Sequence, residues 1–142
     1  MTACCSPAKP PEHEKKRQRA HCPDCGHPAL PVQGRTVLHH ACQPWMLPAD
    51  AHWWVCEQPA CTTVYFSHDR QLNTDAVRDL PAGKNADPAQ PVCFCFGIRR
   101  HEASVPKLKA FVVEQTRNGQ CDCVVRNPAG RCCLKDFPRG GG

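Results

Sequence analysis

The sequence has few of the residues that build a large apolar core. Aromatic residues make up only 6% of its 142 residues. No apolar run approaches the roughly 20 residues that a membrane-spanning helix needs, so we expect no membrane insertion. The 15 Pro and 9 Gly argue against long helices and strands, because proline fixes φ and lacks an amide donor. Burial alone therefore leaves the chain short of stability, and something else must hold it together.

The signatures of common enzyme classes are missing as well. Serine is scarce and lies in no nucleophile elbow, and no glycine-rich phosphate loop is present. The carboxylates are scattered and not paired: Asp24, Glu57, Asp122 and Asp136. We expect no conventional enzyme, and at most an electron-transfer protein in which a cofactor does the chemistry.

Cysteine, by contrast, is abundant, with 13 in the chain. The count is odd, and the opening MTACCSPAKPPEHEKKRQRA is polar and basic, without the apolar centre of a signal peptide. We therefore predict a cytoplasmic location. In a reducing compartment, clustered cysteines are more often metal ligands than disulfides.

Composition divides the chain into two cysteine-bearing modules, at 21–67 and 92–137, joined by a polar linker at 68–91. Residues 1–20 are predicted to be a disordered basic leader, and residues 138–142 a disordered tail. Much of the formal net charge of +5 comes from KKRQR in the leader. We interpret this cluster as a solvated arm, so nucleic-acid binding is not the favoured function.

Each module has its own predicted secondary structure. In the first, HWWVCEQPACTTVYF carries the β-branched and aromatic residues of short antiparallel strands, with EQPA as a turn. In the second, VPKLKAFVVEQTRNG predicts a helix with Pro106 in its first turn and Gly119 after its end. That helix would deliver Cys121 and Cys123 directly beyond its carboxyl end.

Four cysteines of the first module have the spacing of a closed zinc site. Cys22 and Cys25 form a C-x2-C knuckle, and Cys56 and Cys61 form a C-x4-C pair. Two such pairs offer the four thiolates that a structural zinc ion takes in tetrahedral geometry. The pattern therefore predicts a Cys4 zinc site.

Other residues nearby are weaker candidates for the same site. His40 or Cys42 could replace one cysteine, and three more histidines lie close in sequence: His21, His27 and His39. A histidine beside a metal knuckle more often faces solvent or supports a ligand. The aromatic residues of this module are predicted to form its core, since a stacking platform for bases needs a basic groove: Trp45, Trp53, Trp54, Tyr65 and Phe66.

The second module holds six clustered cysteines, more than one zinc ion needs: Cys93, Cys95, Cys121, Cys123, Cys132 and Cys133. Four thiolates in such a group can hold a [2Fe-2S] cluster. Apolar neighbours would exclude water from it, and glycines would leave room for sulfide. Four arginines either offset the anionic charge of such a centre or simply lie in water: Arg99, Arg100, Arg126 and Arg131.

The strings CPDCG, CEQPACTTVYF, VCFCFG and CDCVVRNPAGRCCL together resemble the amino-terminal domain of CopZ-type copper chaperones, over about residues 21 to 137. The resemblance implies one mononuclear zinc ion and one [2Fe-2S] cluster. It implies a small metal-stapled α+β fold, with a zinc-knuckle β-hairpin module first. The short helical [2Fe-2S] module that follows resembles bacterioferritin-associated ferredoxin.

The resemblance also implies which cysteines bind each group. It places zinc at Cys22, Cys25, Cys56 and Cys61, the set that the spacing already predicts. It places the cluster at Cys93 and Cys95, with one cysteine from CDC and one from CC. We favour Cys123 and Cys133, and the alternative register is Cys121 and Cys132. The two remaining thiols could bind a soft ion such as Cu(I), and Cys4 and Cys5 are candidate transient copper ligands.

The sequence departs from the family pattern in two respects. The stretch between Cys95 and Cys121 is short and contains Pro106, so one helix of the ferredoxin-like socket is expected to be reduced. The M-x-C-x-x-C loop of a heavy-metal-associated domain is not found, so we expect the front half of such a chaperone standing alone. Its expected partners are a copper-transporting P-type ATPase or a separate copper chaperone domain, and a redox partner.

Two functions of different classes are consistent with these features. The favoured one is a cytosolic iron-sulfur metallochaperone-like protein, whose cluster transfers one electron to reduce Cu(II) to Cu(I) and whose thiols pass the metal on. The alternative is a binding module with two zinc ions, in which KKRQR contacts nucleic acid or a partner protein. A weaker third hypothesis is a carrier that donates its cluster to another protein.

Overall fold

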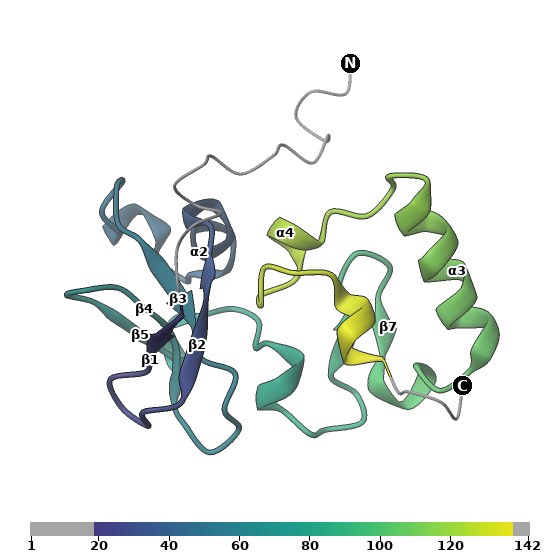
Figure 1. Cartoon of the computed structure of the whole chain (residues 1–142), viewed down its shortest axis with the longest axis horizontal. Coiled ribbons are helices and arrows are strands. Elements are labelled where there is room, and N and C mark those ends of the chain that lie inside the picture. Colours follow the sequence, from purple (N-terminus) through teal and green to yellow (C-terminus); the bar gives the residue numbers. More distant parts are fainter. Residues whose placement is uncertain (1–18, 138–142) are drawn as a thin grey trace.

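The structure is a computed structural model, and it describes residues 19–137. Cys4, Cys5, nearly all of the predicted leader and the predicted tail lie outside the described residues. Within 19–137, a half built on a β-sheet lies beside a half that contains the longest helix (Figure 1). We call residues 19–80 the sheet half and residues 81–137 the helical half.

The sheet half contains five antiparallel strands in the order β1-β2-β3-β4-β5. Their bounds are Ala20–His21 for β1, Pro28–Val32 for β2, Trp53–Val55 for β3, Thr63–Phe66 for β4 and Gln71–Asn73 for β5. Every residue of β4 is buried. This interior strand has partners on both edges, and its β-branched and aromatic side chains suit a position covered on both faces.

The helix α2 (Gly34–His40) contributes Val37 to the core of the sheet half. Val37 is fully buried and belongs to one apolar cluster with Trp53 of β3 and with Val64 and Tyr65 of β4. Trp53 and Tyr65 are therefore core residues, as predicted. Trp45 is different: it lies in the 3-10 turn Pro44–Met46 and is 75% exposed, so its predicted place in the core was wrong.

The predicted linker 68–91 is not a simple connection. Residues 71–73 form β5, which pairs with β4 and so extends the sheet. Val77 forms an isolated bridge with Ala41 and is buried against the sheet core. The polar composition concealed this strand, because β5 is an edge strand in which only Leu72 is partly buried.

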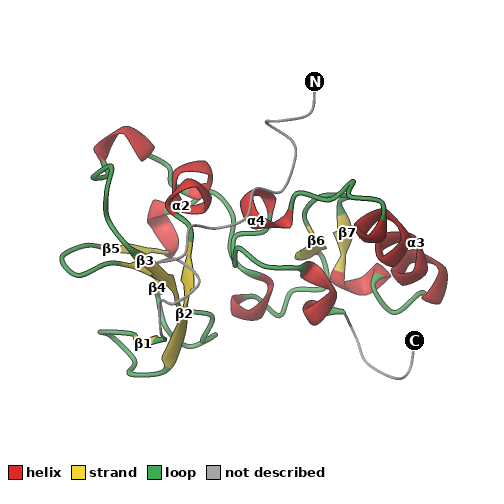
Figure 2. Ribbon diagram, turned by 45° about the horizontal axis from the view of Figure 1, so that its top comes forward, coloured by secondary structure: helices red, strands yellow, loops and turns green. Residues whose placement is uncertain are grey.

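The helical half begins with four short elements, two 3-10 turns (Ala82–Lys84 and Arg100–Glu102) and two strands, and then forms its main helix. Its two-stranded sheet consists of β6 (Pro91–Cys93) and β7 (Ile98–Arg99). The predicted helix is confirmed as α3 (Pro106–Arg117), with Gly119 at φ +73° beyond its end. The short helix α4 (Cys123–Arg126) and the 3-10 turn Cys133–Asp136 follow (Figure 2).

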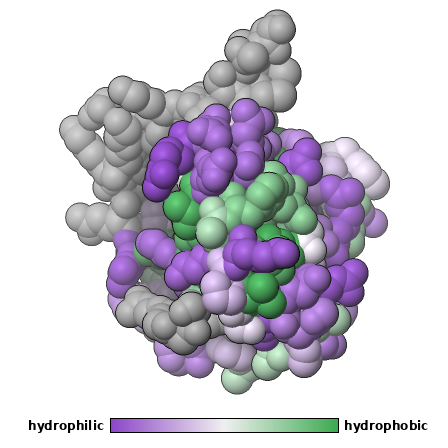
Figure 3. All heavy atoms as spheres, turned by 90° about the vertical axis from the view of Figure 1, so that its right-hand side faces the viewer, coloured by the Kyte–Doolittle hydropathy of each residue, from purple (hydrophilic) through white to green (hydrophobic). Residues whose placement is uncertain are grey.

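The helix α3 packs on the core of this half through one face. Val112 is buried and Leu108 is partly buried against the cluster that contains Cys93, Cys123 and Cys133. The other face leaves Phe111 45% exposed, and hydrophobic residues on this side of the molecule are surrounded by hydrophilic ones (Figure 3). No helix within residues 19–137 is long and apolar enough to cross a bilayer.

The two halves meet where α4 lies beside α2 (Figure 1). The loop after α4 also reaches the sheet half, because Gly130 comes close to Val32 of β2. A Cβ atom at Gly130 would lie only 3.1 Å from Val32 Cγ1, and the φ of +70° also favours glycine at this close approach. The segment that carries Cys123 is therefore packed directly on the sheet half.

Candidate metal centres

The four cysteines predicted to bind zinc lie together in the sheet half. Their sulfur atoms are all within 4.8 Å of one another. Cys22 Sγ lies 3.7 Å from Cys61 Sγ, and Cys25 Sγ lies 3.7 Å from Cys56 Sγ. Such spacing suits four thiolates around one tetrahedral metal ion.

Local structure explains how each pair reaches this position. Cys22 and Cys25 lie on the turn between β1 and β2, which Gly26 closes at φ +77° while its amide donates to the Cys22 carbonyl oxygen at 2.8 Å. Cys56 follows β3, and its amide donates to Val64 of β4 at 2.8 Å. The two strands thus hold the C-x4-C loop opposite the C-x2-C turn.

The chemistry of this group fits a soft dication. Cys22, Cys56 and Cys61 are buried, and burial raises the pKa of Cys56 to about 12. Buried thiols in mutual contact do not ionise readily on their own, because charge in an apolar site is costly. A zinc ion removes that cost by replacing the protons, so the residues present fit it well.

A buried lysine supports the same loop and was missed by sequence reasoning. Lys84 is only 8% exposed, and its Nζ donates to the carbonyl oxygens of Gln58 at 2.8 Å and Cys61 at 2.6 Å. Its charge also acts to lower the pKa of Cys56, although burial outweighs it. Lys84 lies in the predicted linker, and no motif pointed to it.

The four favoured cluster ligands lie together in the helical half. Cys95 Sγ is 3.7 Å from Cys123 Sγ, and the Cys133 thiol contacts both Cys93 and Cys123. Cys93, Cys123 and Cys133 belong to the buried core, and Cys95 packs against it. The contacts therefore run in a row from Cys93 through Cys133 and Cys123 to Cys95.

This second group is more extended than the first. Among the described residues, only the zinc group has all its potential ligand atoms within 4.8 Å of one another. A [2Fe-2S] cluster takes two thiolates on each of its two irons, so its four ligands are spread more widely than those of a single metal ion. The residues present fit a [2Fe-2S] cluster in this respect.

The four thiols of the second group differ in how readily they ionise. Hydrogen bonds from Cys133 and Cys95 lower the pKa of Cys123 to about 3, and the bond with Cys133 lowers the pKa of Cys93 to about 7. The same bonds, with burial, raise the pKa of Cys95 and Cys133. The amide of Asp122 donates to Cys95 Sγ at 3.0 Å. Negative charge is thus stabilised in the middle of the group.

Comparisons with known proteins agree with this geometry. Residues 19–78 match the family model zf_CopZ, described as a zinc binding domain. The Copper chaperone CopZ of Archaeoglobus fulgidus is 29% identical over 129 residues, which cover 84% of this chain and 63% of that protein. The X-ray structure of the Archaeoglobus fulgidus CopZ N-terminal domain is 27% identical, with a TM-score of 0.66, and the match covers 84% of this chain and 99% of that one. Residues 19–78 of this chain are a zinc binding domain similar to that of CopZ.

The weaker zinc candidates take other roles in this domain. His40 is buried and lies beside the Val125 carbonyl oxygen, with 2.6 Å between that atom and Nε2. Cys42 is exposed and lines a cavity of about 450 Å³ with Met46. Three histidines are exposed and lie outside the group of sulfurs: His21, His27 and His39.

The two remaining cysteines of the helical half differ from each other. Cys121 packs against the core, contacts Cys123 and lines a cavity of about 290 Å³ with Cys95 and Arg126. Cys132 is partly exposed and is not among the residues that pack on the core. Of these two cysteines, Cys121 is therefore the one that contacts the second group.

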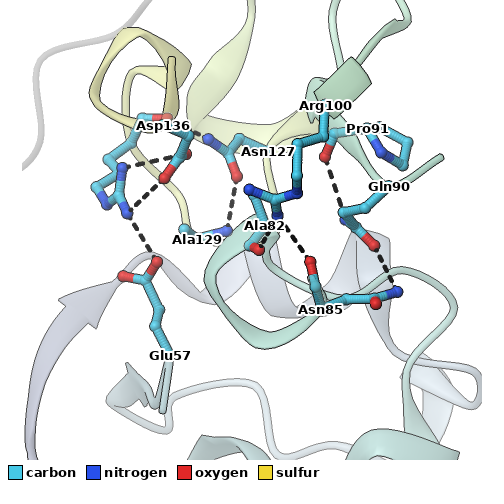
Figure 4. A network of polar contacts seen from close by, with 10 residues as sticks. Glu57, Ala82, Asn85, Gln90, Pro91, Arg100, Asn127, Ala129 and Asp136 are labelled. Atoms are coloured by element: carbon cyan, nitrogen blue, oxygen red, sulfur yellow. Dashed lines mark hydrogen bonds and ion pairs between the residues drawn. The ribbon is translucent and has the colours of Figure 1, made fainter. Parts of the chain in front are cut away.

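The four arginines predicted near the second group make different contacts, and not all of them face it. Arg100 donates to the carbonyl oxygens of Ala82 at 2.6 Å and Asn85 at 2.7 Å (Figure 4). Arg131 is paired with Glu57 at 2.7 Å and with Asp136 at 3.3 Å. Its pKa is raised, because these carboxylates outweigh the effect of burial. Arg99 is exposed, and Arg126 lines the cavity beside Cys95.

Proposed function

We propose that this protein is a cytosolic iron-sulfur metallochaperone-like protein that acts in copper handling. It binds a structural zinc ion through Cys22, Cys25, Cys56 and Cys61. It binds a [2Fe-2S] cluster through Cys93, Cys95, Cys123 and Cys133. The observation that carries the proposal is the second, extended row of mostly buried thiols, separate from the zinc group.

The zinc ion has a structural role in this proposal. Its four thiolates leave no open position for water or substrate, which is typical of structural and not catalytic zinc. The site ties the turn between β1 and β2 to the loop between β3 and β4. That crosslink replaces the large apolar core that the sequence lacks.

When bound, a [2Fe-2S] cluster supplies one-electron transfer. The chain's own residues would hold it away from bulk water, because Cys93 and Cys133 are almost fully buried. Amide groups that point at sulfur stabilise its negative charge, as Asp122 does at Cys95. The reaction proposed is Cu(II) plus one electron to Cu(I), and a redox partner supplies that electron.

Copper is the substrate in this proposal, and Cys121 is a candidate to receive it. Its thiol lines the cavity of about 290 Å³ that Cys95 also lines. Thiolates bind Cu(I) well because both are soft. The similarity to a copper chaperone supports a copper-transporting partner, for which a P-type ATPase or a separate chaperone domain is proposed.

Metal analysis of protein purified without oxygen tests the proposal. We expect one zinc ion, two iron ions and two sulfide ions per chain, as one zinc site and one [2Fe-2S] formula require. The oxidised protein should be coloured, and the reduced protein should give an EPR signal. A colourless protein with two zinc ions and no iron would contradict the proposal and favour a two-zinc binding module.

A further inference from the structure

The segment 123–133, which we call the loop, includes α4 and carries Cys123 and Cys133. Three of its backbone carbonyl groups accept hydrogen bonds from the sheet half. Thr36 Oγ1 donates to the Val124 carbonyl oxygen at 2.6 Å, and His40 Nε2 lies 2.6 Å from that of Val125. Because a carbonyl oxygen only accepts, Nε2 is the donor. Tyr65 Oη donates to the Pro128 carbonyl oxygen at 2.5 Å. All three donors therefore come from the half that carries the zinc group.

The three donor side chains are buried in the folded protein. Thr36 and Tyr65 are fully buried, and His40 is 5% exposed. Thr36 and His40 belong to α2, and Tyr65 lies on the interior strand β4. The elements that carry these donors belong to the sheet half, and Val37 and Tyr65 anchor them in its core, so the donors limit where the loop's carbonyl groups can lie.

The loop has little structure of its own to hold Cys123 in place. The helix α4 spans four residues, fewer than an isolated helix needs to be stable in water. Asn127 closes the loop locally, because its Nδ2 donates to the Arg131 carbonyl oxygen at 2.7 Å. Contacts within the loop therefore determine its shape, whereas contacts with the sheet half determine its position.

The end of the loop is tied to the zinc group by charge. Arg131, two residues before Cys133, is paired at 2.7 Å with Glu57, the residue after Cys56 (Figure 4 labels Glu57 and Asp136). Each partner is 22% exposed. An ion pair therefore links Glu57, beside Cys56 of the zinc group, to Arg131, close in sequence to Cys133 of the second group.

We propose that Thr36, His40 and Tyr65 are positioning residues for the thiols of Cys123 and Cys133. The sheet half is then the platform on which the second metal centre is assembled. This inference rests on the proposed function for the identity of the second centre. The positioning itself does not depend on the proposed function, because it is a property of the protein before iron binds.

Two buried threonines provide a matched test. Thr36 donates to Val124 across the boundary, whereas Thr63 donates to Asp24 within the sheet half. Both are almost fully buried, so Thr36→Val and Thr63→Val each remove one hydroxyl of equal accessibility. Thr36→Ser retains the hydroxyl and should restore wild-type behaviour.

The first measurement is hydrogen exchange by mass spectrometry on zinc-loaded, iron-free protein. Thr36→Val should speed exchange over residues 123–133 by about fivefold, the loss expected from one buried hydrogen bond, with no change near Cys22 and Cys56. Thr63→Val should leave residues 123–133 unchanged. Equal exchange over this segment in wild type and Thr36→Val would overturn the inference, whether or not the protein binds iron.

The second measurement is iron release to a chelator, without oxygen, from protein whose zinc content is verified. Thr36→Val should release iron about fivefold faster than wild type and change the visible circular dichroism, whereas zinc-loaded Thr63→Val and Thr36→Ser should match wild type. Equal release by Thr36→Val and wild type would overturn the inference and leave the proposed function intact. Wild-type protein without iron would instead overturn the proposed function.

Discussion

The ammonium group of Lys84 is hydrogen-bonded to the carbonyl oxygen of Cys61 at 2.6 Å, inside the loop that closes the zinc group. Burying a cation is costly unless hydrogen bonds and nearby negative charge offset the cost. Here Gln58 accepts a second hydrogen bond at 2.8 Å, and four zinc-bound thiolates would supply excess negative charge. Lys84 therefore stabilises the metal-loaded loop more than the metal-free one.

Replacing Lys84 by methionine should weaken zinc binding. Lys84→Met keeps much of the apolar stem but removes the donor and the charge, so the affinity for zinc should fall at least tenfold, about 1.4 kcal/mol. Competition with a chromophoric chelator measures this. Lys107→Met is the control, because Lys107 is exposed on α3 and should leave zinc affinity unchanged. Equal affinities for the two variants would contradict the role given to Lys84.

Zinc binding should strengthen as the pH rises through neutrality. Burial raises the pKa of Cys56 to about 12 in the folded, metal-free protein, so zinc must displace its proton. For the metal-free protein the raised pKa has the opposite consequence. Its contribution to stability is complete below the ordinary thiol value of 9.0 and is lost as the pH rises toward 12.

Two experiments check this pair of expectations. Zinc competition between pH 6 and pH 8 should show affinity increasing with pH, and calorimetry in two buffers should show proton release. Denaturant unfolding above pH 9 should show the metal-free protein losing stability faster than the zinc-loaded protein. A zinc affinity independent of pH would mean that the thiols are already ionised.

The group of four cysteines in the sheet half could be predicted from the sequence because ligand spacing is a local property. The pairs Cys22–Cys25 and Cys56–Cys61 flank turns whose chemistry is visible in CPDCG and EQPA, and strands bring them together. The helix α3 was predictable for the same reason, since Pro106 and Gly119 mark its ends. Turns and helix ends of this kind can be recognised from neighbouring residues alone, without knowledge of long-range contacts.

What could not be predicted depends on long-range contact. Thr36 and Val124 are 88 positions apart in sequence, and nothing in either segment announces their hydrogen bond. Lys84 was hidden in a polar stretch that resembled a linker. The strand β5 was hidden in the same way, because an edge strand with exposed polar residues has no alternating apolar pattern.

Removing the Tyr65 hydroxyl should loosen the boundary between the halves and change the response to high pH. Tyr65→Phe deletes the bond to Pro128 and leaves its carbonyl group buried without that partner, at a cost of about 1 to 3 kcal/mol. Burial raises the pKa of Tyr65, and the charges of Asp79 and Glu57 add to this. Denaturant unfolding of the zinc-loaded protein at pH 7 measures the first effect.

The pH effect follows from the direction of the shift. Because the folded pKa of Tyr65 exceeds the unfolded value of about 10, its contribution to stability is complete below that pH and is lost as the pH rises above it. The stability of wild type should therefore fall more steeply than that of Tyr65→Phe above pH 10, by up to about 1.4 kcal/mol per pH unit. Parallel pH profiles for the two proteins would show that Tyr65 ionises equally in both states.

Gly130 should not tolerate a side chain. It has φ +70°, and an added Cβ would lie 3.1 Å from Val32 Cγ1. Gly130→Ala combines an unfavourable left-handed backbone with this close contact, so it should destabilise the protein by more than the about 1 kcal/mol of the backbone effect alone. Gly97→Ala is the control, since Gly97 has a similar φ of +71° but open space around its Cα. Thermal unfolding of the two variants should place Gly130→Ala lower.

The neighbouring cysteines Cys132 and Cys133 allow a direct test of the cluster ligands. Cys133 is 1% exposed and contacts Cys93 and Cys123, whereas Cys132 is partly exposed and lies outside the core. A serine in place of a ligand thiol binds iron far less well, because iron-sulfur clusters are held by thiolates. Cys133→Ser should therefore lose most of its iron and sulfide, whereas Cys132→Ser should retain both.

The pair Cys121 and Cys123 tests the same choice of cluster ligands independently. Cys123 lies in the row of contacts between Cys133 and Cys95, and Cys121 touches that row only through Cys123. Cys123→Ser should lose the cluster, and Cys121→Ser should keep it. Iron and sulfide content with the visible spectrum measures all four variants, with zinc content as the check on folding. Cluster loss in Cys121→Ser and Cys132→Ser, with retention in the other two, would establish the alternative register.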